Sequence, residues 1–293
     1  MRKTRFMLLL VVIAAAFAAT YYFYFRPDVV ARRAVSKLSD VKTAAFTSQL
    51  TLNNDTATQN LIGEPGTVEI NLDGVFDRGQ NPSSVNTNFD VNIKSESVSV
   101  QIAGQLELIG DQLYFIINKT PSIFPSLVAI KGQWLSIPRG NATTPPANSA
   151  TGDLFTQVKP DGSEKISGTS TARYQTIATT DAVIQMMDGI ANTLGTQLTD
   201  AQINSIRDSV TSAGNIPVEL WITPWSNDLK QISATLNVPG GNTTQFTLTF
   251  KNTNQLVSIN PPESATPLNQ LASPSPAPDQ PTPEPSPSPS PTP

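Results

Sequence analysis

The sequence has no cysteine and no histidine among its 293 residues. Without cysteine no disulfide can form, and thiolate catalysis, iron–sulfur clusters and cysteine-based zinc sites are excluded. Without histidine there is no imidazole base, which excludes a Ser-His-Asp triad and an HExxH zinc site. None of the common glycine-rich phosphate-binding motifs occurs either. We therefore expect a binding or structural protein rather than an enzyme, with no cofactor and no metal.

Charged residues are also scarce, at 14% of the chain, and the net charge is −4. Residues 1–26 carry four basic residues and no acidic one, whereas residues 27–262 carry fifteen basic and twenty acidic residues. Proteins that bind nucleic acid gather positive charge where the phosphates lie. The acidic body of this chain argues against nucleic acid as a partner.

An uncharged, almost wholly apolar run occupies residues 7–25. As a helix it would be about 28 Å long, close to the thickness of the hydrocarbon core of a bilayer. Three basic residues precede it and three tyrosines lie at its far end. This pattern predicts a transmembrane helix within residues 1–26, with the N-terminus cytoplasmic and residues 27–293 outside. The alternative is a signal peptide cleaved after Ala18, because small residues flank Phe17 there.

The other end of the chain is rich in proline. Residues 261–293 contain 13 of the 25 prolines, and therefore lack the backbone donors and apolar side chains that a core needs. We expect a disordered Pro/Ser-rich tail over residues 263–293. It is either a solvated tail without a partner, or a spacer that reaches the cell wall or another envelope partner.

The body between these segments, residues 27–262, alternates apolar and polar residues over long stretches. The alternation is clearest in the segments 46–52, 68–76, 85–93 and 98–108. A period of two predicts strands with one wet and one dry face, as in an antiparallel sheet. Helical spacing predicts helices from Pro27 to Leu38, over 180–194 and from Thr199 to Gly214. Further strands are expected at 133–137, 165–177, 216–223, 229–238, 243–251 and 256–259.

This order of elements predicts an α+β fold. A sheet of about ten strands tends to curl, and we expect the helices on its concave face. The concave face would be apolar, and either the helices or a ligand must fill it.

Six segments follow one another in the body: VSKLSDVKTAAFTSQLTLN, LIGDQLYFII, GQWLSIP, ISGTSTARYQTIATTDAVIQMM, IPVELWITPWSNDLKQISATLNV and PPESATPLNQL. In this order they resemble the LolA/LppX-like superfamily of bacterial lipoprotein carriers and lipid-binding envelope proteins, over most of residues 30–271. The resemblance implies an unclosed β-half-barrel whose concave side, covered by helices, holds a cavity for acyl chains. The chain differs from the lipoprotein members in lacking an N-terminal cysteine, and from the soluble carriers in its apolar run at 7–25.

Several large apolar side chains are candidates for lining such a cavity. Methionine adapts its shape to variable apolar ligands, and tryptophan contributes a large apolar ring. The alternative is that these side chains only fill the core. The candidates are Met186, Met187, Ile190, Trp134, Trp221, Phe89 and Leu106.

Together these features predict a single-pass protein of the cytoplasmic membrane whose extracytoplasmic domain binds lipid or another apolar ligand under a curved sheet. The alternative is a non-enzymatic structural or interaction protein of the cell envelope, with a core filled by its own side chains and a tail that reaches the wall.

Overall fold

The computed structural model describes residues 26–53, 58–59, 62–79, 83–138, 154–184, 198–238 and 242–271. Within these ranges, no helix has both the length and the apolar character needed to cross a bilayer. The predicted membrane segment at 7–25 and most of the predicted tail lie outside the described residues.

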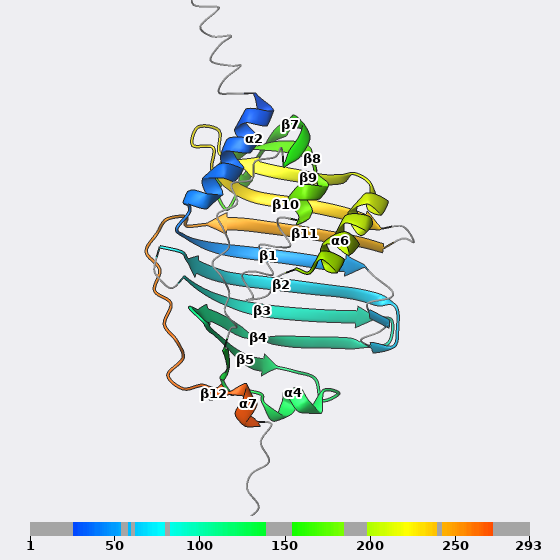
Figure 1. Ribbon diagram of the computed structural model, residues 1–293, viewed down its shortest axis with the longest axis vertical. Helices are drawn as coiled ribbons and strands as arrows, with labels where there is room; N and C mark the ends of the chain where they lie inside the picture. Colours follow the sequence, from blue (N-terminus) through cyan, green and yellow to red (C-terminus); the bar gives the residue numbers. More distant parts are fainter. Residues whose placement is uncertain are drawn as a thin grey trace, which may run out of the picture.

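One large sheet dominates the structure (Figure 1). Its twelve strands are β1 (Thr43–Asn53), β2 (Gly66–Asp77), β3 (Ser84–Ser95), β4 (Ser99–Ile109), β5 (Gln112–Lys119), β6 (Leu135–Pro138), β7 (Phe155–Ile166), β8 (Thr169–Ala178), β9 (Ile216–Ile222), β10 (Leu229–Val238), β11 (Asn242–Lys251) and β12 (Thr266–Pro267). Their order is β12-β6-β5-β4-β3-β2-β1-β11-β10-β9-β8-β7. All neighbours are antiparallel except β12 and β6, which are parallel. The strands β7 and β12 lie at opposite ends, so the sheet is unclosed, as predicted.

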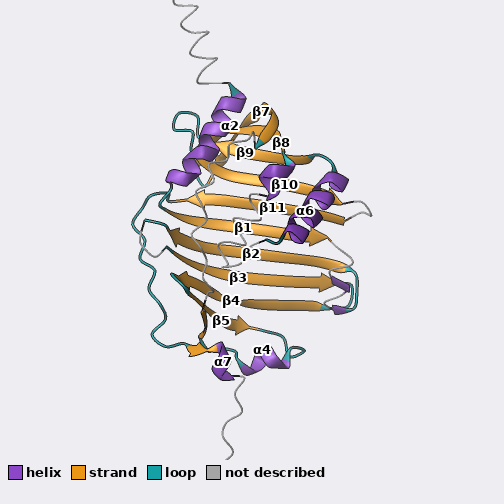
Figure 2. Ribbon diagram, viewed as in Figure 1, coloured by secondary structure: helices purple, strands orange, loops and turns teal. Residues whose placement is uncertain are grey.

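Short helices accompany the sheet (Figure 2). They are α2 (Pro27–Ser36), which continues into the 3-10 helix η2 (Lys37–Asp40), α4 (Pro125–Ala129), α6 (Asp200–Ala213) and α7 (Leu268–Leu271). The prediction of a helix after Thr199 is confirmed. The Thr199 hydroxyl accepts a hydrogen bond from the Gln202 backbone, and the Gln202 side chain accepts one from the Thr199 backbone. Of the helix predicted over 180–194, residues 180–184 are helical and the rest lies outside the described residues.

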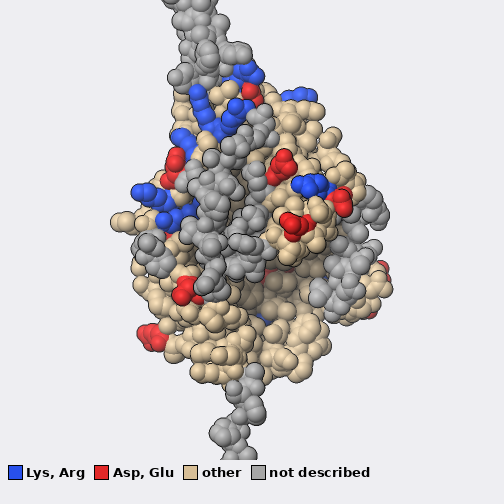
Figure 3. All heavy atoms as spheres, viewed as in Figure 1, with Lys and Arg blue, Asp and Glu red and all other residues tan. Residues whose placement is uncertain are grey.

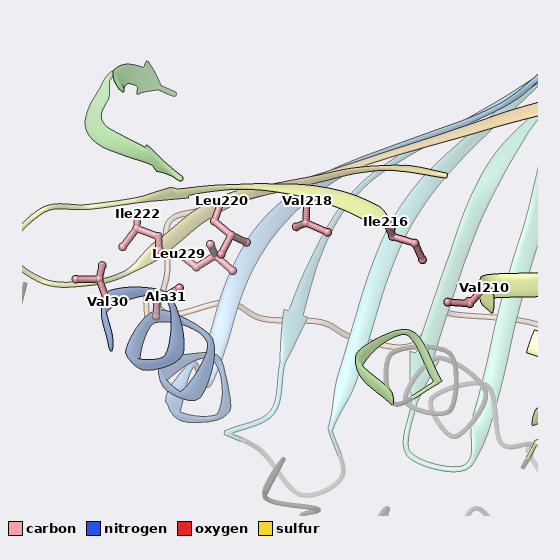
Figure 4. Close-up of a cluster of buried hydrophobic side chains, with 9 residues drawn as sticks. Val30, Ala31, Val210, Ile216, Val218, Leu220, Ile222 and Leu229 are labelled. Carbon is pink, nitrogen blue, oxygen red and sulfur yellow. The ribbon is translucent and has the colours of Figure 1, made fainter. Parts of the chain in front are cut away.

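Two clusters of buried apolar side chains form on the face that carries α2 and α6. In the larger one, Val30, Ala31 and Ala34 of α2 pack with β9 side chains such as Leu220 and Ile222 (Figure 4). Val210 of α6 belongs to the same cluster, which covers the β7–β10 end of the sheet. The smaller cluster is built from Val68, Ile93 and Val100 on β2, β3 and β4, with Ile62 and Phe124 packed against it.

Three sequence predictions differ from the structure. The strand expected over 165–177 is instead the end of β7 followed by β8, joined by a turn at Ser167 and Gly168, both with positive φ. No strand forms over 256–259. The sheet also continues past residue 262, because β12 pairs with β6.

The opposite face of the sheet buries two acidic side chains, those of Asp77 and Glu107. Glu107 on β4 is 5% exposed, and its Oε1 accepts hydrogen bonds from Asn86 Nδ2 (2.7 Å) and Gln105 Nε2 (3.0 Å). Its Oε2 is buried without a hydrogen-bond partner among the described residues. Burial raises the pKa of the Glu107 carboxyl above its ordinary value of 4.5.

This burial predicts a pH-dependent stability. Above pH 4.5 the unfolded chain releases the Glu107 proton while the folded chain retains it, so stability falls as pH rises towards the folded-state pKa. The Glu107→Gln variant removes this ionisable carboxyl group. The Tm of the variant should therefore exceed that of the wild type by more at pH 7 than at pH 4. Thermal denaturation followed by circular dichroism measures both. Glu69→Gln, at a less buried site on the same face, is the control; an equal effect in both variants would contradict the prediction.

Candidate functional site

The two faces of the sheet differ sharply in chemistry. Directly paired residues point to the same side of a sheet, and successive residues point to opposite sides. The register aligns Phe46 with Gly74 and Phe250, and Leu72 with Ser48 and Phe89. The face that packs against α2 and α6, here called the apolar face, accordingly carries Leu220, Ile232, Leu248, Phe46, Leu72, Phe89, Leu106 and Phe115. The opposite, polar face carries Thr47, Gln49, Asn71, Asp73, Asn88, Asp90 and Thr247.

Coverage of the apolar face is uneven. Among the described residues, α2 packs mainly on β7 and β9, and α6 on β10. Leu220 and Ile222 beneath them are fully buried. The smaller cluster buries Val68, Ile93 and Val100 at the other side of the face. Between the two clusters, on β11, β1, β2, β3, β4 and β5, lie further apolar side chains that belong to neither cluster.

A central patch of apolar side chains therefore stays half-buried. Its members lie on the apolar face near the middle of the sheet: Phe46, Leu72, Phe89, Leu106, Phe115 and Leu248. The Phe46 ring lies against that of Phe76, with 6.4 Å between the ring centroids. Side chains at the centre of a packed interior are normally almost fully buried. The central patch thus keeps accessible apolar surface where a filled core would leave none.

Gly104 on β4 shapes the floor of this patch. It pairs with Phe89 on β3, and a Cβ atom at position 104 would lie 2.7 Å from Cζ of the Phe89 ring. It would also lie 2.0 Å from the carbonyl oxygen of Ile116. Because glycine has no side chain, the Phe89 ring can pack directly against the backbone of β4.

A groove of about 610 Å³ lies on the polar face rather than beneath the helices. Two rows of side chains border it, one with Thr47, Asp73 and Asn88, the other with Gln49 and Asn71. Several of these groups already bond within the sheet; Gln49 Nε2, for example, donates to Glu69 Oε1 at 2.9 Å. The groove is open, and its lining also includes Ser48, Leu72, Phe89 and Gly104 of the same strands.

The structure brings together only some of the predicted site residues. Phe89 and Leu106 both belong to the central patch. Trp221 lies on the polar face, is 5% exposed, and donates from Nε1 to Glu164 Oε2 at 3.1 Å. Trp134 precedes β6, is half-buried, and accepts a backbone hydrogen bond from Thr266 (2.9 Å). The three candidates Met186, Met187 and Ile190 lie outside the described residues.

Sequence reasoning did not single out Phe46, Leu72, Phe115 and Leu248. The signal was present, because each lies in phase with the apolar residues of its own strand. The sequence did not provide the strand order, which places side chains of β5 and β11 on the same face of the sheet as those of β3.

The chemistry of the site is that of a binding surface. No charged side chain belongs to the central patch, and the described residues hold no cluster of three or more acidic, histidine or cysteine side chains able to hold a metal ion. Such a surface can take up apolar groups but offers no paired acid and base for catalysis.

No known family profile matches the chain, and no curated protein sequence matches it. Solved structures do. The lipoprotein LppX from Mycobacterium tuberculosis matches 80% of this chain and 98% of its own length, with 13% identity and a TM-score of 0.41. LprF from Mycobacterium bovis matches 80% of this chain and 96% of its own, with 12% identity and a TM-score of 0.46. A LolA superfamily protein from Nitrosomonas europaea matches 78% of this chain and 94% of its own, with 10% identity and a TM-score of 0.22.

The chain therefore has structural matches among LppX, LprF and LolA-like proteins over most of its length. All three identities are low and all three TM-scores lie below 0.5.

The close contact at Gly104 yields a stability prediction. Gly104→Ala places a methyl group against Phe89 and the Ile116 carbonyl, and should destabilise the fold by about 1–3 kcal/mol. Phe89→Leu withdraws the ring, so the double variant should lose less stability than the sum of the single variants. Urea denaturation of the four proteins measures this coupling. Strictly additive losses would contradict the packing of Phe89 on Gly104.

Proposed function

We propose that this protein binds a lipid or another apolar ligand against the apolar face of its sheet, outside the cytoplasm and anchored to the membrane by residues 7–25. The observation that carries the proposal is the central patch, whose large apolar side chains stay half-buried in the middle of an otherwise well-covered face.

The energetics favour a chain-like apolar ligand. Removing apolar surface from water contributes roughly 25 cal/mol per Å², or about 0.8 kcal/mol for each buried methylene group. Six large side chains along β11, β1, β2, β3, β4 and β5 offer a surface long enough for several methylenes. The lack of charge within the patch places any polar head group at its border, where it stays hydrated.

Two sequence features support the envelope location. The run at 7–25 has the length and flanking charges of a membrane anchor. The six ordered segments that resemble the LolA/LppX-like superfamily imply both an extracytoplasmic protein and a hydrophobic ligand.

The ligand proposal is tested by filling the patch. Leu106 is half-buried, whereas Leu108, two residues further along the same face of β4, is 6% exposed. Leu106→Trp should occupy open space, keep Tm within a few degrees, and lower the uptake of a fluorescent fatty acid at least tenfold. Leu108→Trp should overpack the interior and cost about 1–3 kcal/mol of stability.

Native mass spectrometry of the detergent-free protein, with and without added fatty acid, reports ligand binding directly. A clean ligand-free mass and no uptake by the wild type would refute the proposal. Equal destabilisation by both tryptophan substitutions would instead support the alternative, a structural or interaction protein whose core is filled by its own side chains.

The location predicts a labelling pattern. The chain has no cysteine, so Asp111→Cys in the exposed turn between β4 and β5 creates a unique thiol. A membrane-impermeant maleimide should label it in intact spheroplasts. Arg5→Cys, on the cytoplasmic side of the predicted anchor, should react only after permeabilisation. The reverse pattern, or protection of both, would overturn the orientation.

A further inference from the structure

Charged residues are unevenly distributed along the chain, and ligand binding by the central patch does not explain this distribution. Residues 26–42 carry five basic and two acidic residues, a net charge of +3. The remainder, from residue 43 to the end, carries eleven basic and twenty-one acidic residues, a net charge of −10. Figure 3 shows lysine and arginine side chains gathered at the end of the molecule where α2 lies. A positive surface therefore sits on an otherwise acidic protein.

The packing of α2 directs this charge outwards. The helix buries Val30, Ala31 and Ala34 against the sheet. Because these residues take up one side of the helix, the long basic side chains occupy the others, and Arg32 on α2 and Lys37 at the start of η2 are exposed. Arg26 is partly exposed and pairs with Asp28 at 3.0 Å.

An exposed tryptophan lies next to the C-terminal end of this helix. Trp225, in the turn between β9 and β10, is 85% exposed. The turn is well ordered: the Thr223 backbone N–H donates to the Asp228 carbonyl at 3.0 Å, and the Ser226 hydroxyl donates to the Asp228 carboxylate at 2.7 Å. Lys37 joins it to α2 by donating to the Ser226 carbonyl and by an ion pair with Asp228 at 3.5 Å.

We propose that Arg26, Arg32, Arg33, Lys37 and Trp225, here called the basic surface, dock onto the head groups of an anionic bilayer. Arginine and lysine near such a membrane are attracted to its negative surface potential, and tryptophan favours the membrane–water interface. The basic surface thus orients the sheet relative to the membrane, a property separate from ligand binding by the central patch.

The position of the basic surface in the chain supports this partner over a soluble acidic one. The apolar run ends at residue 25, directly before Arg26. A ten-residue helix such as α2 is about 15 Å long, so every residue of the surface on α2 lies within that distance of the point where the chain would leave the bilayer. The screening length at physiological salt is about 8 Å, so the charges at the far end of α2 contribute only if the helix lies along the membrane surface.

A single-cysteine probe in the full-length protein tests the docking. Trp225→Cys carries an apolar, environment-sensitive fluorophore that takes the place of the exposed indole ring, and Val128→Cys, an exposed position on α4, which precedes β6, carries the same label. The labelled proteins are reconstituted into vesicles of phosphatidylcholine alone or with phosphatidylglycerol, each containing a nitroxide-labelled lipid. Quenching at 225 should be at least twofold stronger in the anionic vesicles, and quenching at 128 should be weak in both.

Charge-reversal variants distinguish an effect of the basic surface on quenching from an effect of the net charge of the protein. Arg32→Glu with Arg33→Glu should reduce quenching at 225 to the level seen with phosphatidylcholine alone. The matched control, Lys94→Glu with Lys131→Glu, changes net charge equally at two exposed lysines elsewhere and should leave quenching unchanged. Circular dichroism of each variant verifies that the fold is retained.

Unquenched label at 225 in anionic vesicles, or equal quenching in both lipid mixtures, would overturn the docking proposal. If the chain does not insert, the proposed anchor is wrong. Anionic vesicles are then added to the free protein, and absence of quenching there overturns the docking as well. Fatty-acid uptake is measured on the same samples, so that loss of docking and loss of ligand binding remain distinguishable.

Discussion

The structure depends on one constraint: a single sheet of twelve strands has an apolar face that must be removed from water. Strands lie about 4.8 Å apart, so twelve of them span roughly 50 Å along the sheet. Each helix, with its side chains, covers roughly 10 Å. The described helices that pack on this face are α2, α6 and the helical residues 180–184, and they lie over the β7–β10 end of the sheet. Phe89, Leu106 and their neighbours lie outside this cluster and are half-buried.

The open ends of the sheet are handled differently from its faces. At one end β7 contains two register shifts in its pairing with β8, and its residues include Lys159, Pro160 and Glu164. Irregular pairing, proline and charge all discourage the addition of another strand. At the other end the two-residue strand β12 and the short helix α7 lie beside β6. Both edges are thus poorly suited to pairing with further strands, which leaves the faces as the surfaces for binding.

Sequence reasoning predicted the strands best where one face is dry. In β1 to β4 the predicted segments of alternation lie within the observed strands, apart from Val98, which precedes β4 by one residue. It failed for β7, because an edge strand with polar residues at most positions has no alternation to detect. It also failed for β12, a strand of two residues defined only by its partner β6. Strand order and the outermost elements depend on long-range pairing, which a local pattern does not contain.

The candidate site shows the same division. Phe89 and Leu106 were predicted from alternation and do lie on the apolar face. Trp221 was selected for its size, although its neighbours Leu220 and Ile222 already occupy the apolar face of β9, and alternation places the residue between them on the other side. The hydrogen bond from Trp221 to Glu164 gives that ring a structural role between β9 and β7. Parity along the strand is therefore a better guide to the site than residue type.

Helix α2 packs on the core with one side and carries the basic surface on the other. Its buried side, Ala31 and Ala34 above all, closes the larger core cluster over β9, while its exposed side carries the basic residues. Small residues on the buried side let the helix lie close to the sheet, so its position follows that of β7 and β9. Because α2 packs on β7 and β9, the orientation of the basic surface is linked to that of the sheet. If α2 lies along the membrane, the strands that carry the central patch are held at a constant height above the bilayer, which suits a protein that takes up apolar molecules there.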